Sequence, residues 1–290
     1  MKLLILSDIH SNLDALDAIC EPHDELWVLG DIVNYGPEPI ETLESVKATA
    51  SVVVQGNHDY AVGYDDDSRW SARFRDVAEE TRRFTSSQLS SPQKAWLRSL
   101  PVSAQVERKG VRFYLTHATL ADPHYGRIAA DSDEWTAELK RIDADVLLVG
   151  HSHVPFIRRI GRKLIVNPGS VGQSRSGDAL ASYAIWDDGA FTLHTAYYPV
   201  ETTIAKLKLL GFKEPVEQEL VATLQTGGLL NPPGLPPEYF YVQFCAWRNA
   251  EPTDSAKRVS RLTATSCCHQ PMLFEHRIVK VRILAQSATP

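Results

Sequence analysis

The sequence predicts an α/β fold in which helices cover sheets of buried strands. Two observations support this prediction: short apolar runs rich in β-branched residues recur along the chain, and segments with helix signals lie between them. Nearly continuous apolar runs are typical of strands buried on both faces, as in a sheet covered by helices. Six such runs are present, at residues 2–7, 25–29, 51–55, 112–116, 145–149 and 163–166.

The segments between these runs carry helix signals. Residues 12–20 place leucine and isoleucine at helical spacing. Ser91-Pro92 provides an N-cap followed by proline at the first helical position, and Asp131 with Glu134 resembles a capping box that opens a helix to about residue 142. The first part of the chain is therefore βαβ-like. Two later helices are expected at residues 202–210 and 215–224.

The pattern changes after residue 180. Residues 181–186 and 191–198 flank the turn signal Asp187-Asp188-Gly189 and predict an antiparallel hairpin, from which we expect a second, mixed sheet. From residue 231 the chain is Pro-rich, and residues 251–290 hold six Lys/Arg against three Asp/Glu. The expected organisation is one domain at residues 1–230 and a Pro-rich linker with a basic, partly disordered extension of unknown role at residues 231–290, in which 239–245 and 278–284 could each form a strand.

Composition and charge restrict the function classes. The 290 residues are 43% hydrophobic and 23% charged, which excludes collagen-like, coiled-coil and wholly disordered chains. The net charge of −6 gives no general attraction for nucleic acid or anionic lipid. No apolar stretch approaches the roughly 18 residues of a membrane span, and Asp8 and His10 interrupt the opening run too early for a signal peptide.

These features predict a cytoplasmic protein with no membrane partner and no nucleic-acid partner. The four cysteines show no CxxC spacing, so thiolate metal sites are not expected. A homo-oligomer formed through an apolar sheet edge stays an open alternative.

Metal-binding side chains follow the predicted strands. Ligands of open α/β sheets bind at the carboxyl ends of strands, so the residues just after each run are informative. Singly, each fragment has an ordinary explanation as a turn, a helix cap or a buried histidine. Together they hold five of the ten histidines, and burying so many polar groups side by side is costly unless a cation organises them. The fragments are Asp8-Ile9-His10, Gly30-Asp31, Gly56-Asn57-His58-Asp59, His117 and Gly150-His151-Ser152-His153.

The ordered fragments DxH, GDIVNYG, GNHD, His117 and GHSH resemble those of the calcineurin-like metallophosphoesterase superfamily. SDIHSNLDAL, GDIVNYGP, GHSHVP and NPGSVGQ look like its small bacterial phosphodiesterase branch, and the resemblance covers about residues 1–200. It implies a four-layer α/β/β/α sandwich with two mixed sheets and two metal ions at the strand ends. The ligands that it implies are Asp8, His10, Asp31 and His153 for one ion, with Asp31 bridging to a second ion held by Asn57, His117 and His151.

The resemblance also implies a reaction. Imidazole and carboxylate ligands without thiolate suit divalent transition metals, so we expect two such ions, with manganese as the first choice and iron, zinc, nickel or cobalt as alternatives. The expected function is hydrolysis of small, nucleotide-like phosphodiesters. Hydroxide activated by the ions would attack phosphorus in line, and His58 would be the catalytic general acid that protonates the leaving alkoxide.

Other functions remain open. Asn34-Tyr35 stands where protein phosphatases of this fold carry Asp-Arg, so the arginine that would clamp a phosphate dianion is missing; this favours diesters over a phosphomonoesterase. A non-catalytic scaffold would use the fold for protein contacts, but every implied ligand position and His58 are filled by competent residues. A nuclease subunit would need the basic tail to hold nucleic acid.

Four further residues are candidates near the site. Asn34 or Asp59 would orient His58, because the usual carboxylate of the second motif is absent. Arg175 follows the glycine-containing loop 167–172 and is either a phosphate contact or a solvated surface arginine, while the loop itself is either an anion cradle or a tight turn. Tyr125 would either stack on a base or pack at the rim of the site.

Overall fold

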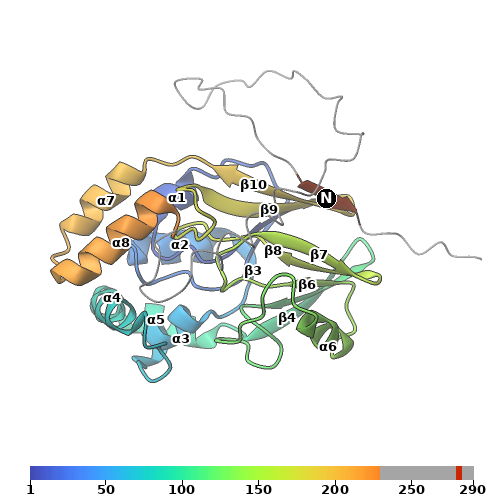
Figure 1. Ribbon diagram of the computed structural model, residues 1–290, viewed down its shortest axis with the longest axis horizontal. Coiled ribbons are helices and arrows are strands. Elements are labelled where there is room, and N and C mark those ends of the chain that lie inside the picture. The colour runs from blue at the N-terminus through green and yellow to red at the C-terminus, as the bar shows by residue number, and fades with distance from the viewer. Residues whose placement is uncertain (229–278, 283–290) are drawn as a thin grey trace, which may run out of the picture.

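The computed structural model describes residues 1–228 and the backbone of residues 279–282. Within these residues the strands form two mixed sheets (Figure 1). The first contains β1 (Lys2–Leu6), β2 (Glu25–Val28), β3 (Ala50–Val53), β9 (Ala181–Asp187), β10 (Ala190–Ala196) and β11 (Val279–Arg282), in the order β11-β10-β9-β1-β2-β3. The second contains β4 (Ser103–Arg108), β5 (Val111–Thr116), β6 (Val146–Leu148), β7 (Phe156–Ile160) and β8 (Lys163–Asn167), in the order β4-β5-β6-β8-β7.

Each sheet contains three parallel strands, whose carboxyl ends lie at the same edge of the sheet. In the first sheet β1, β2 and β3 are parallel, and β9 pairs antiparallel with β1. In the second sheet β5, β6 and β8 are parallel, and β4 and β7 are antiparallel edge strands. The helices are α1 (Leu13–Asp17), α2 (Pro39–Thr49), α3 (Asn57–Tyr64), α4 (Arg75–Gln88), α5 (Ser91–Ser99), α6 (Glu134–Lys140), α7 (Val200–Lys208) and α8 (Glu214–Thr226).

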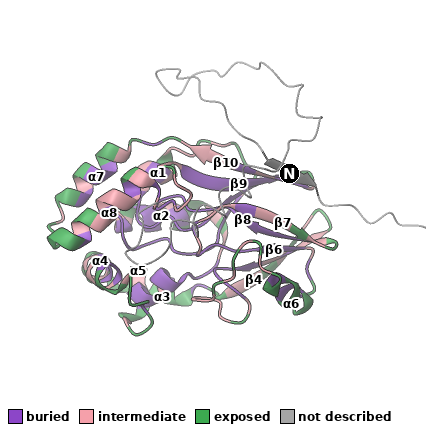
Figure 2. Cartoon of the chain, viewed as in Figure 1, coloured by how far each residue is buried: buried purple, intermediate pink, exposed green. Residues whose placement is uncertain are grey.

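Three apolar cores separate the four layers. Leu4 and Leu6 of β1 pack with residues of α1 and α2, whereas Leu3 and Ile5 face the second sheet. This alternation follows from the two-residue period of a strand, and it explains why β1 is apolar at every position. The outer face of the second sheet packs against α6 through residues such as Trp135. The predicted four-layer α/β/β/α sandwich is therefore confirmed, and Figure 2 shows its strands buried beneath helices whose outer faces are exposed.

Aromatic side chains join the two sheets at the centre. The Phe113 ring lies edge-on to Trp27 of the other sheet, with ring centroids 5.1 Å apart, and edge-on to Trp186 at 5.3 Å. Edge-to-face pairs of this kind contribute about 0.5–1.5 kcal/mol each beyond the area that they bury. The two sheets are thus held at a fixed separation in the centre of the sandwich.

The predicted hairpin is present, but its assignment to a second sheet was wrong. β9 pairs with β1, with Leu3 opposite Trp186, so the hairpin extends the first sheet. The second sheet instead begins at β4. The hydrophobic pattern identifies a strand that is buried on both faces but does not specify its neighbour, since pairing depends on contacts far along the chain.

Several local predictions also need correction. Residues 51–55 were expected to form a strand buried on both faces, but β3 lies at the sheet edge and is mostly half-buried. Asp131 forms no capping box: α6 begins at Glu134, and Oγ of Ser132 accepts a hydrogen bond from the Glu134 backbone N–H. The cap of α5 is Ser90 rather than Ser91, in a capping box with Gln93.

The predicted late helices correspond to α7 and α8. Of the two strands predicted in the extension, residues 278–284 contain β11, which pairs with β10, and residues 239–245 lie outside the described residues. The boundary at residue 230 stays a prediction. Among residues 1–228 and 279–282, none of the helices has the length and apolar character needed to span a membrane.

Candidate metal centre

Loops from both sheets are hydrogen-bonded to one another at the strand ends. The Asp8 N–H after β1 donates to the Gly30 carbonyl after β2 (3.0 Å), and the Gly150 N–H after β6 donates to the His117 carbonyl after β5 (2.8 Å). The Gly172 N–H, after β8 of the second sheet, donates to the Asp8 carbonyl (3.0 Å). The loops that carry the predicted ligands therefore form one connected surface.

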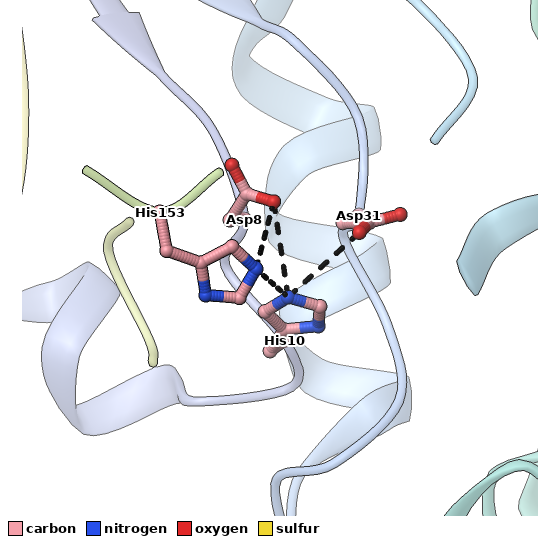
Figure 3. A group of neighbouring side chains, drawn as sticks. All are labelled: Asp8, His10, Asp31 and His153. Atoms are coloured by element: carbon pink, nitrogen blue, oxygen red, sulfur yellow. Dashed lines mark hydrogen bonds and ion pairs between the residues drawn. The ribbon is translucent and has the colours of Figure 1, made fainter. Parts of the chain in front are cut away.

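One group of buried ligand atoms lies around Asp8. Asp8, His10, Asp31 and His153 each offer one atom, and these atoms lie within 4.8 Å of one another (Figure 3). Nε2 of His153 is 3.2 Å from Oδ1 of Asp8 and 3.2 Å from Nε2 of His10. Nε2 of His10 is 3.8 Å from Oδ2 of Asp31. The structure thus brings together all four residues implied for the first ion.

A second group shares Asp31. Asp31, His117 and His151 also offer atoms within 4.8 Å of one another. Nε2 of His117 lies 3.2 Å from Oδ2 of Asp31 and 3.0 Å from Oδ1 of Asn57. Asn57 is therefore beside the second group, and Asp31 lies between the two groups, as a bridging carboxylate must.

The histidine tautomers suit metal binding. Nδ1 of His10, His117 and His153 each faces a backbone carbonyl, of Val33 (3.4 Å), Leu29 (2.8 Å) and Gln173 (2.6 Å) respectively. A ring that donates its Nδ1–H to a carbonyl presents the lone pair of Nε2 on its other side. All three rings therefore direct Nε2 into the site, where His10 and His153 present a lone pair and His117 does so once it has lost the proton that Asp31 favours.

The same geometry shows that the residues fit a cation. Nε2 of His10 and Nε2 of His153 lie 3.2 Å apart, and when Nδ1 of each ring donates to its backbone carbonyl, two lone pairs face each other and favour a cation beside them. Oδ1 of Asp8, Oδ2 of Asp31 and Nε2 of His151 are also fully buried without a hydrogen-bond partner. Buried acceptors left unpaired in this way are costly, and metal ions bound at the two groups would satisfy all of them. Nitrogen and oxygen donors without thiolate match divalent transition metals.

The protonation states agree with this fit. Burial lowers the pKa values of His10, His151 and His153, which keeps these imidazoles neutral. Burial alone would raise the pKa of Asp31. The charges of His117 and His58 outweigh this effect, so the pKa of the Asp31 carboxyl lies well below its usual range. Neutral imidazoles and ionised carboxylates are the forms that bind metals.

The backbone of the site is strained. Asp8, His10, Asp31, His151 and His153 all have φ between 52° and 62°, in the left-handed region that non-glycine residues rarely adopt. Such conformations cost roughly 1–2 kcal/mol each and persist only where surrounding contacts enforce them. In this site the left-handed conformations turn the ligand side chains toward one point. The backbone strain is therefore a cost of bringing the ligands together.

His58 lies at the start of α3, beside the metal centre. Its Nε2 is 4.0 Å from Oδ2 of Asp31, and its ring packs between Tyr35 and Trp70, at centroid distances of 4.5 and 4.8 Å. Nδ2 of Asn34 donates to Nδ1 of His58 (2.7 Å), which leaves the ring proton on Nε2. Burial lowers the pKa of His58 to about 4, so the ring is neutral and directs an N–H at the site.

The structure separates the two candidate orienting residues. Asn34 contacts His58, whereas Asp59 does not: its Oδ2 accepts from the backbone N–H groups of Asp31 (2.9 Å) and Gly56 (3.0 Å), and its Oδ1 accepts from that of Ile32 (2.9 Å). Asp59 therefore fixes the Asp31 loop against the start of α3. Burial and the charge of Asp31 raise the pKa of Asp59 to about 7.

Loop 167–172 is a packed turn rather than an open anion cradle. Its Gly169, Val171 and Gly172 N–H groups donate to Oδ1 of Asn167 and to the carbonyls of Ser7 and Asp8. A Cβ on Gly172 would collide with the Ile9 carbonyl, which explains the glycine. These donors are therefore not free for a substrate.

The other two candidates lie at the rim. Arg69 covers the Tyr125 ring, with its guanidinium carbon 4.0 Å from the centroid, so that ring face is occupied by a protein side chain. The Arg175 guanidinium carbon lies 4.9 Å from the Phe74 ring centroid. Sequence reasoning missed Trp70, which packs on His58. Trp70 comes from a loop without a recognisable motif, and no local signal could have identified it.

A four-layer sandwich with two adjoining carboxylate–imidazole clusters at its strand ends has the architecture of a metallophosphoesterase. Residues 1–188 match the family model of the calcineurin-like phosphoesterase superfamily domain, and the chain belongs to that superfamily. The resemblance noted in the sequence is thus confirmed, including its small bacterial branch.

Relatives support the assignment. The chain is 27% identical over 201 residues to phosphodiesterase YfcE of Escherichia coli, covering 67% of this chain and 91% of that protein. It is 29% identical over 211 residues to an uncharacterized protein of Methanocaldococcus jannaschii, covering 66% and 84%. A crystal structure of a metallophosphoesterase from Sphaerobacter thermophilus superposes with a TM-score of 0.67 at 32% identity, covering 78% of this chain and 99% of that one.

Proposed function

We propose that this protein is a phosphodiesterase that uses two divalent transition metal ions, with manganese as the first choice, to hydrolyse small nucleotide-like phosphodiesters. The observation that carries the proposal is the convergence of Nε2 of His10 and Nε2 of His153, 3.2 Å apart, beside the carboxylate of Asp8. The relative named phosphodiesterase YfcE supports the diester class.

The ligand residues would hold one ion at Asp8, His10, Asp31 and His153, and a second at Asp31, Asn57, His117 and His151. When bound, the ions supply positive charge for the phosphoryl oxygens and lower the pKa of water. Asp31 belongs to both groups through its unpartnered Oδ2, so it would contribute to both positions. The backbone carbonyls bonded to Nδ1 keep the rings of His10, His117 and His153 from rotating.

His58 would act on the leaving group. Asn34 occupies Nδ1, so the proton available to substrate is on Nε2, which faces the site. The packing of Tyr35 and Trp70 holds the ring plane. As negative charge develops on the leaving oxygen, Nε2–H of the neutral ring donates a hydrogen bond to that oxygen, and transfer of its proton would leave His58 as an imidazolate whose Nδ1 accepts from Asn34.

The test is hydrolysis of bis-p-nitrophenyl phosphate by protein reconstituted with Mn²⁺, compared with hydrolysis of p-nitrophenyl phosphate. We expect faster turnover of the diester. A higher kcat/KM for the monoester would favour the phosphomonoesterase alternative, and no hydrolysis with any divalent transition metal would exclude the enzyme.

The His58→Ala variant tests the proton donor. We expect wild-type metal content and a kcat lower by roughly 10²–10⁴-fold, the usual effect of losing a general acid. His23→Ala is the matched control, because His23 is exposed and lies before β2, at the opposite end of that strand from Asp31. Loss of metal from His58→Ala would show that His58 is a ligand instead.

A further inference from the structure

The indole of Trp70 lies against one face of His58, the proposed proton donor. The two rings have centroids 4.8 Å apart and planes inclined by 31°, so they are nearly face to face. Nδ2 of Asn34 donates to Nδ1 of His58 (2.7 Å) and fixes one edge of the imidazole. The tilt of the ring still depends on packing, because the outer torsion of a histidine side chain has broad minima. Trp70 supplies the flat surface that limits this tilt.

Trp70 comes from the segment between α3 and α4, residues 65–74, which contains no helix or strand. Its side chain is buried in an apolar cluster with Val77 and Ala78 of α4. A buried indole N–H requires a hydrogen-bond acceptor, and in a segment without regular structure that acceptor largely determines where the ring lies. The acceptor of Trp70 therefore bears on the geometry of His58.

Asp67 is that acceptor. Its Oδ1 accepts a hydrogen bond from Nε1 of Trp70 (2.8 Å). The same carboxylate accepts two bonds from Arg82 of α4, one from Nε to Oδ1 (2.9 Å) and one from Nη2 to Oδ2. A guanidinium and a carboxylate joined by two such bonds have a fixed mutual orientation. Contacts thus run from Arg82 on a helix through Asp67 and Trp70 to the ring of His58.

Other contacts of the same segment are more exposed. Arg69 pairs with Asp122 of the loop after β5, but the two side chains are 51% and 36% exposed. Exposed ion pairs of this kind contribute little to holding a structure in place. Arg82, in contrast, is 8% exposed. The bonds of Asp67 to Arg82 and Trp70 are therefore the main polar constraint on the indole.

We propose that Asp67 is a positioning residue for the proton donor: through Trp70 it holds the His58 ring at the tilt that directs Nε2–H to the leaving oxygen. The inference rests on the proposed function and adds a residue outside the metal centre that controls its leaving-group step. Removing the Asp67 carboxylate leaves the indole N–H without its acceptor, so Trp70 would shift. A small misplacement of a reacting group lowers a rate by up to roughly 10²-fold.

The chain contains a matched control for Asp67. Glu25 accepts a hydrogen bond from Nε1 of Trp27 (2.9 Å) and pairs with Nε of Arg108 (2.7 Å). Glu25 begins β2, at the opposite end of that strand from Asp31. The Glu25→Ala variant therefore removes the same kind of carboxylate–indole–guanidinium contact without altering the surroundings of His58.

The first experiment compares two diesters as substrates of the full chain reconstituted with Mn²⁺. Diphenyl phosphate has a basic phenolate leaving group that requires a proton, whereas the p-nitrophenolate of bis-p-nitrophenyl phosphate requires one much less. We expect kcat of Asp67→Ala and of Trp70→Leu to fall at least ~10-fold more for diphenyl phosphate than for the nitrophenyl ester, with KM unchanged. Trp70→Phe keeps a flat ring and should restore most of the loss.

The double variant tests whether Asp67 acts through Trp70. Adding Asp67→Ala to Trp70→Leu should cause no further loss, because the contact is already absent. Glu25→Ala should leave the ratio of the two kcat values as in wild type. Equal losses for the two diesters, or losses that add in the double variant, would show a merely structural role and overturn the proposal.

The second experiment needs no turnover. Proton NMR of the metal-free full chain with isotope-labelled histidine gives the Hε1 resonance of His58, assigned by its loss in His58→Ala. The ring current of the stacked indole shifts this resonance upfield. Asp67→Ala should move it toward its position in Trp70→Leu, and Glu25→Ala should not move it. An unmoved resonance in Asp67→Ala would overturn the proposal, whereas the expected shifts in a protein that hydrolyses neither diester would refute the proposed function alone.

Discussion

Replacing Ser11 with glycine should stabilise the protein, although the change removes a side chain from a buried position. Ser11 has φ of 53° and an Oγ that is buried without a hydrogen-bond partner. Its backbone conformation is enforced by hydrogen bonds from its N–H to the Ile32 carbonyl (2.9 Å) and from the Glu38 N–H to its carbonyl (3.0 Å). A serine is therefore held in a shape that suits glycine.

The magnitude follows from three contributions. Left-handed backbone costs a non-glycine residue roughly 1–2 kcal/mol, which glycine avoids. The greater freedom of glycine in the unfolded chain offsets roughly 0.5–1 kcal/mol of that gain. Removing an unpaired buried hydroxyl adds about 1 kcal/mol or more. The net expectation for Ser11→Gly is a gain of about 1–2 kcal/mol in the free energy of unfolding.

Ser11→Ala is the matched control, because it removes the hydroxyl and keeps the Cβ. Urea unfolding of the metal-free protein, followed by circular dichroism, gives the free energy of each variant. We expect the order glycine, alanine, serine from most to least stable. If the glycine variant were less stable than the alanine variant, the left-handed backbone would not be a source of strain, and the interpretation of the other strained site residues would fail with it.

Three other predictions concern the same region. Gly56→Ala should lower metal content severalfold, because the new Cβ would collide with the Asp31 carboxylate; metal analysis at wild-type occupancy would contradict this. The charge of Asp31 outweighs burial and raises the pKa of His117 to about 9 in the metal-free protein. Metal binding at pH 7.5 should therefore release a proton, and the affinity for metal should increase as the pH rises to 9. Calorimetric heats that do not depend on the buffer would refute this proton release. Lys206→Met should destabilise the fold by about 1–2 kcal/mol in thermal unfolding, because Lys206 bridges Asp14 and Glu38 at 2.8 Å each; an unchanged Tm would show that the bridge is dispensable.

The site was predictable from the sequence because its residues follow strands directly. Three ligands come within two residues of a strand end or of the glycine that follows it: Asp8, Asp31 and His117. Parallel strands bring such positions together at one edge of a sheet. The choice between Asn34 and Asp59 was not predictable, since both are polar and near His58 in the motif pattern. Only the folded loops show that Asp59 bonds to backbone and Asn34 to the ring.

Features that depend on distant contacts escaped prediction. The hairpin at β9 and β10 has a clear local signal, but its partner β1 lies at the other end of the domain. Trp70, which packs on His58, comes from the segment between α3 and α4, and no spacing rule links these two residues. The local sequence pattern thus identified strands, helices and candidate ligands. Which strands pair and which distant side chains contact each other could be seen only in the structure.

The hydrogen-bonded loops at the strand ends have a consequence for synthesis of the chain. Neither group of ligand atoms is complete within the first sheet, because one requires His153 and the other requires His117 and His151. A nascent chain that has emerged only as far as β3 therefore cannot retain a cation at either position. Metal uptake would then report that the later half has docked, and incomplete or truncated chains would emerge from translation empty and inactive.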